Sequence, residues 1–395
     1  MELLSNTVQS YDWGSTTALP RLMGTAPTGE PQAELWMGAH PAAPSRVDRA
    51  QGPLPLDRVI ASDPAAELGA ETLRRFGPRL PFLLKLLAAD APLSVQVHPD
   101  LAQAEAGFAR ENALGVPPDA PHRTYRDAHH KPEMIVALTP FDGLCGFREP
   151  RRCAELLDTL RVPGLRAHAE ALRALPEKAA LAQVFTTFLH PPAGLVDDVA
   201  EAVAAQAAAE PGGPYPADLL AYERIARARP GDPGLLPALM LRHITLAPGE
   251  ALFLGAGIPH AYLSGLGVEI MASSDNVLRC GLTSKHVDAG ELAKVVRFTA
   301  RPTRVLTPRD EEGEQVYPAP VDDFRLSRLR LRTGEPPRPL PAGAPQILLC
   351  TEGEAQVVSA DASLRIGPGR SLYVPAVEEV RVAGSGTVFR ATVGV

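Results

Sequence analysis

Residues 246–288 read LAPGEALFLGAGIPHAYLSGLGVEIMASSDNVLRCGLTSKHVD, and the fold that we predict is organised around this stretch. Short apolar segments alternate with Pro and Gly turns, a pattern typical of successive short antiparallel strands. His260 follows a Gly-Ile-Pro turn, and Glu269, Asp275 and Arg279 come on the adjoining segments. Because Glu, Asp and Arg are rarely buried unless they are paired, these residues indicate a functional site and not ordinary core.

The composition limits the class of protein. The chain has 395 residues, of which 22 % are charged, and its formal net charge is −7. This length is sufficient for two or three domains, and the mild acidity argues against a nucleic-acid partner. No apolar run reaches about 18 residues, so we expect no membrane span. The first residues lack the pattern of a signal peptide, and four scattered cysteines are typical of reduced thiols. We therefore expect a cytoplasmic protein, and we expect it to be a monomer.

A second group of polar side chains lies upstream, in residues 81–100. The apolar run 82–87 is interrupted only by Lys85, and it predicts a buried strand or a short helix. The following LSVQVH alternates, and side chains two residues apart share one face of a strand. Ser94, Gln96 and His98 therefore point to one side and the two valines to the other. Their shared face is either exposed to solvent or lines a site.

Residues 101–138 combine a helix, a loop and a strand. The segment 101–128 begins with a helical pattern and ends in a Pro-rich loop, and residues 134–138 are an apolar β run. Glu133 stands at the entrance of that run, where a carboxylate needs a partner cation. His40 precedes a Pro on a predicted loop, and we expect it to lie outside the site.

The distribution of elements predicts three units. Residues 150–240 are rich in Ala, Leu, Glu and Arg at helical spacing, which predicts a helical insert. Residues 301–395 show short strands and Gly-rich turns, which predict a separate β domain. That domain contains no histidine, so we expect it to hold no metal. The catalytic domain would then comprise residues 1–149 and 241–300, with a helix over 291–300.

Four residues from separate segments offer metal ligands. Gln96, His98, Glu133 and His260 together supply an amide oxygen, two imidazoles and one carboxylate. Two imidazoles and a carboxylate form a common zinc or iron ligand set with an open position for water or substrate. A neutral amide as the further ligand leaves the site positively charged, which suits a Lewis acid that polarises a carbonyl.

Other charged residues around these ligands have two possible roles. The cations could bind an anionic group such as phosphate, and the two carboxylates Glu269 and Asp275 could transfer protons. The residues alone leave open that the same carboxylates and cations form structural salt bridges. The cations are Lys85, Lys131, Arg279 and Lys285.

Four motifs, in order along the chain, closely resemble those of the type I mannose-6-phosphate isomerases. They are SVQVHPD (94–100), AHHKPEMIVAL (128–138), GIPHAYLSG (257–265) and GVEIMASSDNVLRCGLTSKHVD (267–288). The segments YDWGS and ELWMGAHP near the N-terminus match the family as well. The resemblance extends from about residue 5 to residue 300 and is weak beyond. Cys280 and Ser284 depart from the family pattern, but they stand beside the matching site residues and not on them.

The resemblance implies a mainly β fold with a cupin-type β-barrel (jelly roll) catalytic domain, an inserted helical domain and a second, C-terminal cupin-like β domain. It implies one zinc ion per chain, with ligands at Gln96, His98, Glu133 and His260. The family's essential active-site arginine matches Arg279, and the family's pocket positions match Glu269, Lys131, Asp275, Ser94, Lys85 and Tyr262. Among these we expect Arg279, Glu269, Lys131 and Asp275 to be catalytic and Ser94, Lys85 and Tyr262 to bind the substrate.

The activity that the resemblance implies is the interconversion of mannose 6-phosphate and fructose 6-phosphate through an enediol(ate). The partner would be this small phosphosugar, for GDP-mannose biosynthesis or for mannose catabolism. We favour Glu269 as the base, with Lys131 or Asp275 as alternatives. We expect Lys85 and Ser94 to contact the phosphate, in preference to Lys285. Two other functions remain open from the residues, namely a cupin oxygenase with iron and a non-catalytic sugar-binding cupin.

Overall fold

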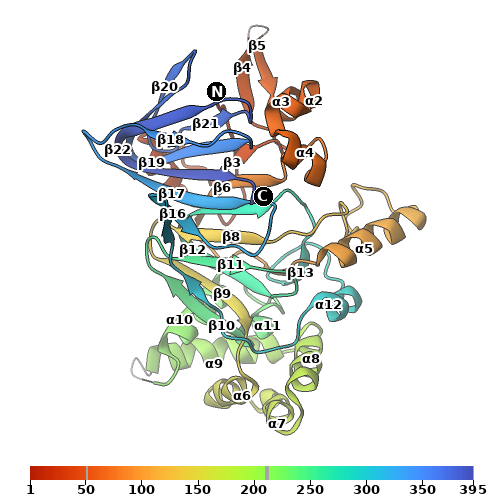
Figure 1. Cartoon of the computed structure of the whole chain (residues 1–395). Coiled ribbons are helices and arrows are strands. Elements are labelled where there is room, and N and C mark those ends of the chain that lie inside the picture. Colours follow the sequence, from red (N-terminus) through yellow and green to blue (C-terminus); the bar gives the residue numbers. More distant parts are fainter. Residues whose placement is uncertain (50–51, 210–212, 395) are drawn as a thin grey trace.

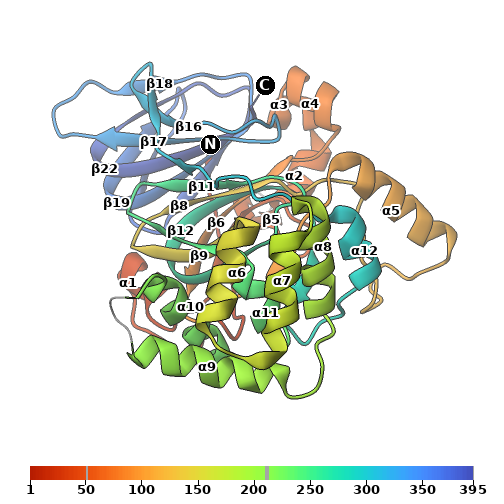
Figure 2. The same cartoon turned by 90° about the horizontal axis from the view of Figure 1, so that it is seen from below.

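Antiparallel β-sheets form most of the structure, a computed structural model that describes residues 1–49, 52–209 and 213–394. Figure 1 shows the C-terminal strands at the top, a central sheet in the middle and a group of helices at the bottom. Figure 2, the view from below, shows how these helices cover the central sheet. Among the described residues, no helix combines the length and apolar character that crossing a membrane requires.

The central sheet contains eleven strands among the described residues. Its main path follows the order β14-β11-β8-β12-β6-β3-β2, and the remaining four strands pair beside β12 or with one another. The strands are β2 (Thr7–Gln9), β3 (Glu34–Gly38), β6 (Phe82–Ala89), β7 (Val95–Val97), β8 (Glu133–Ala137), β9 (Phe141–Phe147), β10 (Leu241–Leu246), β11 (Ala251–Leu254), β12 (His260–Ala272), β13 (Leu278–Gly281) and β14 (Val305–Leu306).

The long strand β12 joins the two halves of the central sheet. Its first residues, from His260 to Ser264, pair with β9, and residues 265–272 pair with β6. The change of partner occurs at Gly265, which has φ +122°. A Cβ atom there would lie within 2.9 Å of backbone atoms of Pro140 and Phe141. Glycine is therefore required where the strand bends.

A second antiparallel sheet, the C-terminal sheet, packs against the central sheet. It includes the first strand of the chain, because β1 pairs with β21. Outward side chains of β3, β6, β8 and β12 form one buried cluster with side chains of β17, β19, β21 and β22. The strands of the C-terminal sheet are β1 (Glu2–Leu3), β15 (Arg309–Glu311), β16 (Glu314–Tyr317), β17 (Arg325–Leu331), β18 (Arg338–Leu340), β19 (Gln346–Val358), β20 (Ser363–Ile366), β21 (Ser371–Val374) and β22 (Val380–Thr392). A separate hairpin joins β4 (Arg46–Arg49) and β5 (Gly52–Pro55).

Helices pack against the part of the central sheet formed by β7, β9, β10, β13 and the first residues of β12. Their apolar residues share one buried cluster with Val95 and Val97 of β7 and with Cys280 of β13. This group comprises α6 (Pro150–Thr159), the 3-10 turn η1 (Pro163–Leu165), α7 (Arg166–Ala174), α8 (Glu177–Phe188), α9 (Leu195–Ala209), α10 (Pro216–Ala228) and α11 (Leu235–Leu239). The prediction of helices within residues 150–240 is confirmed.

The other helices lie outside this group. They are α1 (Ala18–Met23), α2 (Leu56–Ser62), α3 (Pro64–Leu68), α4 (Ala70–Phe76), α5 (Leu101–Ala113) and α12 (Ala289–Val295). Asp100 starts α5, because its carboxylate accepts the backbone N–H of Gln103 at 2.9 Å. The helix predicted over 291–300 is wrong in its second half. The chain leaves the helix at Val296, and Val296 and Phe298 instead pack beside the helical group.

Candidate metal centre and active site

The inner faces of four adjacent strands carry charged side chains. β3, β6, β12 and β8 lie side by side, and alternate residues of each point away from the C-terminal sheet. A charged residue stands at one such position in every strand. They are Glu34, Lys85, Glu269 and Glu133, and none is more than 6 % exposed. Buried charges of this kind persist only when they are paired or bind a metal.

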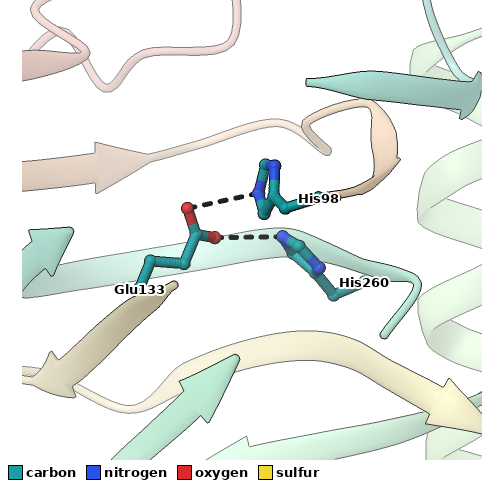
Figure 3. A group of neighbouring side chains, drawn as sticks. All are labelled: His98, Glu133 and His260. Carbon is teal, nitrogen blue, oxygen red and sulfur yellow. Dashed lines mark ion pairs between the residues drawn. The ribbon is translucent and has the colours of Figure 1, made fainter. Parts of the chain in front are cut away.

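His98, Glu133 and His260 meet in one buried cluster (Figure 3). His98 follows β7, Glu133 begins β8, and His260 begins β12. The Nε2 atom of His260 lies 3.0 Å from one carboxylate oxygen of Glu133, and that of His98 lies 3.4 Å from the other. The ligand atoms of all three side chains lie within 4.8 Å of one another, close enough to share one ion.

The hydrogen bonds of this cluster fit a metal. The Nδ1 atom of His98 lies 2.8 Å from the carbonyl oxygen of Asn276. The Nδ1 atom of His260 lies 2.9 Å from the carbonyl oxygen of Ile258. A carbonyl only accepts, so Nδ1 carries the proton and the Nε2 lone pair faces Glu133. Both Nε2 atoms are buried without a hydrogen-bond partner. Burial also lowers the pKa of His98 to about 4, which keeps the ring neutral. Three acceptor atoms that face one another in a buried space form a ligand set that fits a metal cation.

Gln96 lies beside this cluster on β7. It pairs in register with His260 on one side and with Arg279 on the other. Gln96 and Ser94 line a cavity, whereas Val95 and Val97 pack in the helical core. The predicted alternation of this segment is therefore confirmed, and the polar face lines a site.

The cavity has a volume of about 740 Å³, which is ample for a sugar phosphate. It gathers side chains from β3, β6, β7, β8, β12 and β13 and from the Pro-rich loop after α5. The residues that the sequence predicted for the site and that line this cavity are Lys85, Ser94, Gln96, Lys131, Glu133, Tyr262, Glu269, Asp275, Arg279 and Lys285.

Lys85 lies between two buried carboxylates. Its Nζ atom is 3.0 Å from Glu269 and 3.5 Å from Glu34. Burial alone would lower the pKa of Lys85, but Glu269 and Glu34 together raise it above its usual value. Burial raises the pKa of Glu269, and Lys85 opposes this shift. Lys85 is therefore a charged bridge and not a free anion-binding cation.

Glu34 is a site residue that the sequence analysis missed. Its carboxylate accepts the indole N–H of Trp36 at 2.6 Å and also faces Lys85. The signal was present, because ELWMG places Glu34 and Trp36 on one face of a strand whose other face is apolar. The identity of its partner required the pairing of β3 with β6, which the sequence does not state.

Three further cations line the cavity, from the loop after α5, from β13 and from the loop that follows β13. They are Arg126, Arg279 and Lys285, and among the described residues no carboxylate lies within ion-pair distance of any of them. Burial and then the charge of Arg126 lower the pKa of Arg279, and Arg279 is the main cause that lowers the pKa of Lys285. Mutual repulsion of this kind is relieved when an anion binds.

The loop before β13 holds further site residues. The buried side chain of Asn276 donates to the carbonyl oxygens of Asp127 and His129, and the Asn276 carbonyl oxygen holds His98. Asn276 thus joins the Pro-rich loop to the metal centre, a role that the sequence analysis did not identify. His40, which we expected outside the site, lines the cavity and lies 3.4 Å from Asp275. That expectation is wrong, because residues 34–38 form a strand inside the central sheet and bring His40 to its rim.

Known proteins whose sequences are similar to this chain are named for the same enzymatic activity. The model of the type I phosphomannose isomerase catalytic domain matches residues 1–150. Mannose-6-phosphate isomerase of Escherichia coli (strain K12) is 41% identical over 397 residues, which cover 99% of this chain and 99% of the relative. Mannose-6-phosphate isomerase of Rattus norvegicus is 32% identical over 409 residues, which cover 95% of this chain and 94% of the relative.

Solved structures of such proteins have the same fold. A point mutant of phosphomannose isomerase from Salmonella typhimurium matches with a TM-score of 0.93 and 38% identity over all of both chains. A zinc-bound mannose 6-phosphate isomerase matches with a TM-score of 0.91 and 38% identity, over all of this chain and 99% of that chain. Together with the trio of His98, Glu133 and His260, this likeness identifies zinc as the cofactor that the sequence predicted.

Proposed function

The chain belongs to the type I mannose-6-phosphate isomerases, as its 41% identity to a member along 99% of its length shows, and from this premise we propose that it interconverts D-mannose 6-phosphate and D-fructose 6-phosphate through an enediol(ate). One observation carries the proposal. A single cavity is lined by Gln96 and Glu133 of the proposed metal centre, by the buried carboxylate of Glu269 and by three cations that have no carboxylate partner among the described residues. These groups supply the electrophile, the base and the phosphate anchor that the isomerisation needs.

We assign the zinc ligands to His98, Glu133, His260 and Gln96. The support is the trio of facing acceptor atoms and the position of Gln96 next to His260 in the sheet. When bound there, zinc supplies a Lewis acid that stabilises the negative charge developing on the sugar oxygens. Backbone carbonyls orient both imidazole rings, so the ligands need little rearrangement to bind the ion.

Glu269 is the base that we favour for moving the proton between C2 and C1. Its carboxylate is buried, lines the cavity and is held at 3.0 Å by the ammonium group of Lys85. Burial favours the neutral acid, so the carboxylate gains by accepting a proton. The alternatives are less suited. Lys131 is engaged 3.1 Å from Glu133, and the carboxylate of Asp275 is 54% exposed beside His40.

The phosphate group has a better partner than Lys85. Because Lys85 already balances two carboxylates, we propose that Arg126, Arg279 and Lys285 bind the phosphate. Two guanidinium groups and one ammonium group match a dianionic phosphate in charge, with Arg126 held in place by the backbone carbonyls of Pro118 and Ala120, to which it donates. Ser94, which lines the same cavity, remains a proposed further donor to the phosphate.

The other predicted site residues have proposed roles beside the reacting carbons. Tyr262 places its hydroxyl group 3.5 Å from Glu133, where it can also meet a sugar hydroxyl. Arg279 lies next to Gln96 in register, and we propose that it both binds the anion and assists ring opening. Cys280 points into the helical core, so its departure from the family pattern leaves the cavity unchanged.

Several finer expectations remain proposals. We propose that the central sheet forms the cupin-type barrel and the C-terminal sheet a second, metal-free one. We also propose that the chain divides into a catalytic domain of residues 1–149 and 241–300, a helical insert of residues 150–240 and a C-terminal β domain of residues 301–395. A cytoplasmic location, a monomeric state, the absence of nucleic-acid partners and a place in GDP-mannose biosynthesis are predictions of the sequence alone.

The proposed reaction is tested by a coupled assay of fructose 6-phosphate formation from mannose 6-phosphate. The purified protein is measured before chelation, after chelation and after zinc is added back. We expect chelation to abolish turnover and zinc to restore it. A folded, zinc-loaded protein that binds the sugar without turnover would support the non-catalytic cupin, and oxygen consumption with iron would support the oxygenase. Family membership favours the isomerase over both.

A further inference from the structure

A second cavity, of about 1080 Å³, lies apart from the catalytic one. Its walls are the segment 296–304 after α12, the residues just before β12, the strands β14–β16 and the loop that follows β16. The residues that line it and those that line the catalytic cavity have no member in common. It is therefore a separate site, and the proposed isomerase chemistry does not use it.

The floor of the second cavity is apolar. Phe253 and Ile258 come from the central sheet side, Phe298 from the segment after α12, and Tyr317 and Phe324 from the C-terminal sheet side. Phe298, Tyr317 and Phe324 are buried. Concave apolar surface of this size is typical of sites for small organic ligands, since it buries most of the surface of such a molecule.

The rim of this cavity is strongly basic. Arg297, Arg301, Arg304 and Arg309 are exposed, and among the described residues no carboxylate lies within ion-pair distance of their guanidinium groups. Lys178 adds a further cation. The carboxylate in the lining, Glu311, is already paired with Arg325 at 2.7 Å.

This concentration of unpaired arginines is unusual in a chain whose net charge is −7. Arginines usually disperse over an acidic surface and pair with its carboxylates. Here four of them line a cavity with an apolar floor, and none has a carboxylate partner in the part of the chain that the structure describes. A guanidinium group binds carboxylate, sulfate or phosphate through two parallel hydrogen bonds. The arrangement therefore matches a ligand with an apolar body and an anionic group.

We propose that the second cavity binds a small organic anion, with its apolar body on the aromatic floor and its anionic group among the rim arginines. The apolar floor argues against a bare inorganic anion, and the arginine rim argues against a neutral lipid or sugar. The two cavities share no lining residue, although Ile258, which lines the second cavity, also accepts a hydrogen bond from His260 through its backbone carbonyl.

The test compares two probes of the same shape on the full-length, zinc-loaded protein. Isothermal titration calorimetry measures the binding of naphthalene-2-sulfonate and of its neutral analogue naphthalene-2-sulfonamide. We expect saturable binding of one sulfonate per chain and at least about tenfold weaker binding of the sulfonamide, which is about 1.4 kcal/mol. Saturating mannose 6-phosphate should leave the sulfonate affinity unchanged.

A pair of double variants locates the bound probe. Arg301→Gln with Arg304→Gln should weaken sulfonate binding at least about tenfold and leave isomerase activity unchanged. Arg365→Gln with Arg381→Gln removes the same charge from exposed positions outside both cavities and should change nothing. Equal affinity for both probes, displacement by mannose 6-phosphate, equal effects of the two double variants, or no saturable binding would each overturn the proposal. Loss of turnover alone would concern only the isomerase reaction.

Discussion

Replacing Lys85 by Met should destabilise the protein by leaving two buried carboxylates without their cation. Lys85 is 6% exposed, and its ammonium group lies 3.0 Å from Glu269 and 3.5 Å from Glu34. Met fills a similar volume but carries no charge. Removing one partner of a buried ion pair costs about 3–5 kcal/mol, which is a large part of the total of about 5–15 kcal/mol typical of a folded protein. We therefore expect a loss of unfolding free energy of about 3–5 kcal/mol.

Urea unfolding at constant excess zinc measures this loss. Lys294→Met is the matched control, because Lys294 also pairs with a carboxylate, Glu291, at 2.8 Å but is 65% exposed. A surface pair contributes about 0–1 kcal/mol. The double variant Lys85→Met with Glu34→Gln should recover part of the stability, because it leaves one buried carboxylate instead of two. Equal losses in Lys85→Met and Lys294→Met would refute the reasoning.

The pH dependence gives a second readout of the same variant. Burial already raises the pKa of Glu269 in the folded protein, and loss of Lys85 removes the charge that opposes this rise. An acid whose folded-state pKa exceeds its unfolded value stabilises the fold when protonated, and this contribution is lost as the pH rises above the unfolded value. The deficit of Lys85→Met should therefore be larger at pH 8 than at pH 5.5. A deficit that grows on acidification would contradict the assignment.

Four further substitutions test the proposed metal centre, the proposed anion site and the bend of β12. His260→Ala should lower zinc content, measured by atomic absorption, together with activity, since it removes one of three facing ligands; full activity without zinc would exclude the assigned centre. Arg279→Ala should lower kcat/KM at least about tenfold with zinc retained, and Lys285→Gln should mainly raise KM for mannose 6-phosphate. Loss of zinc in Arg279→Ala would instead indicate a structural role. Gly265→Ala should lower the free energy of unfolding, measured by urea denaturation, by about 2 kcal/mol or more, because Gly265 has a φ of +122° and close backbone neighbours. Gly367→Ala is the control and should be tolerated, because a Cβ atom there meets open space.

Local pattern was sufficient to predict the alternation of polar and apolar side chains in residues 93–98. The alternation of Ser94, Gln96 and His98 with two valines left open whether the polar face was exposed to solvent or lined a site, and the structure places Ser94 and Gln96 on the cavity and the valines in the core. Such patterns are reliable because side chains alternate along any strand, whatever its neighbours are. The same reasoning failed for residues 296–300, where packing beside the helical group overrides a helical pattern.

Partners across the sheet could not be predicted in this way. Lys85 was expected to bind phosphate, but the register of β6 against β12 and β3 places it between Glu269 and Glu34. No sequence pattern linked Asn276 to the metal centre, and none linked His40 to Asp275. Their roles depend on the path of loops that meet only in the folded chain.

The sequence by itself therefore determined the family, the mainly β class, the helical segments and the chemical types available for a zinc centre. The tertiary structure decided which charges neutralise one another and which are left for a substrate. The physical reason is that secondary structure follows from local periodicity, whereas an ion pair depends on distances of a few ångströms between segments far apart in the chain. Lys85 and Lys285 line the same cavity, and only the fold pairs the first with two buried carboxylates and leaves the second without a carboxylate within ion-pair distance among the described residues, which is why we propose that Lys285 binds an anion.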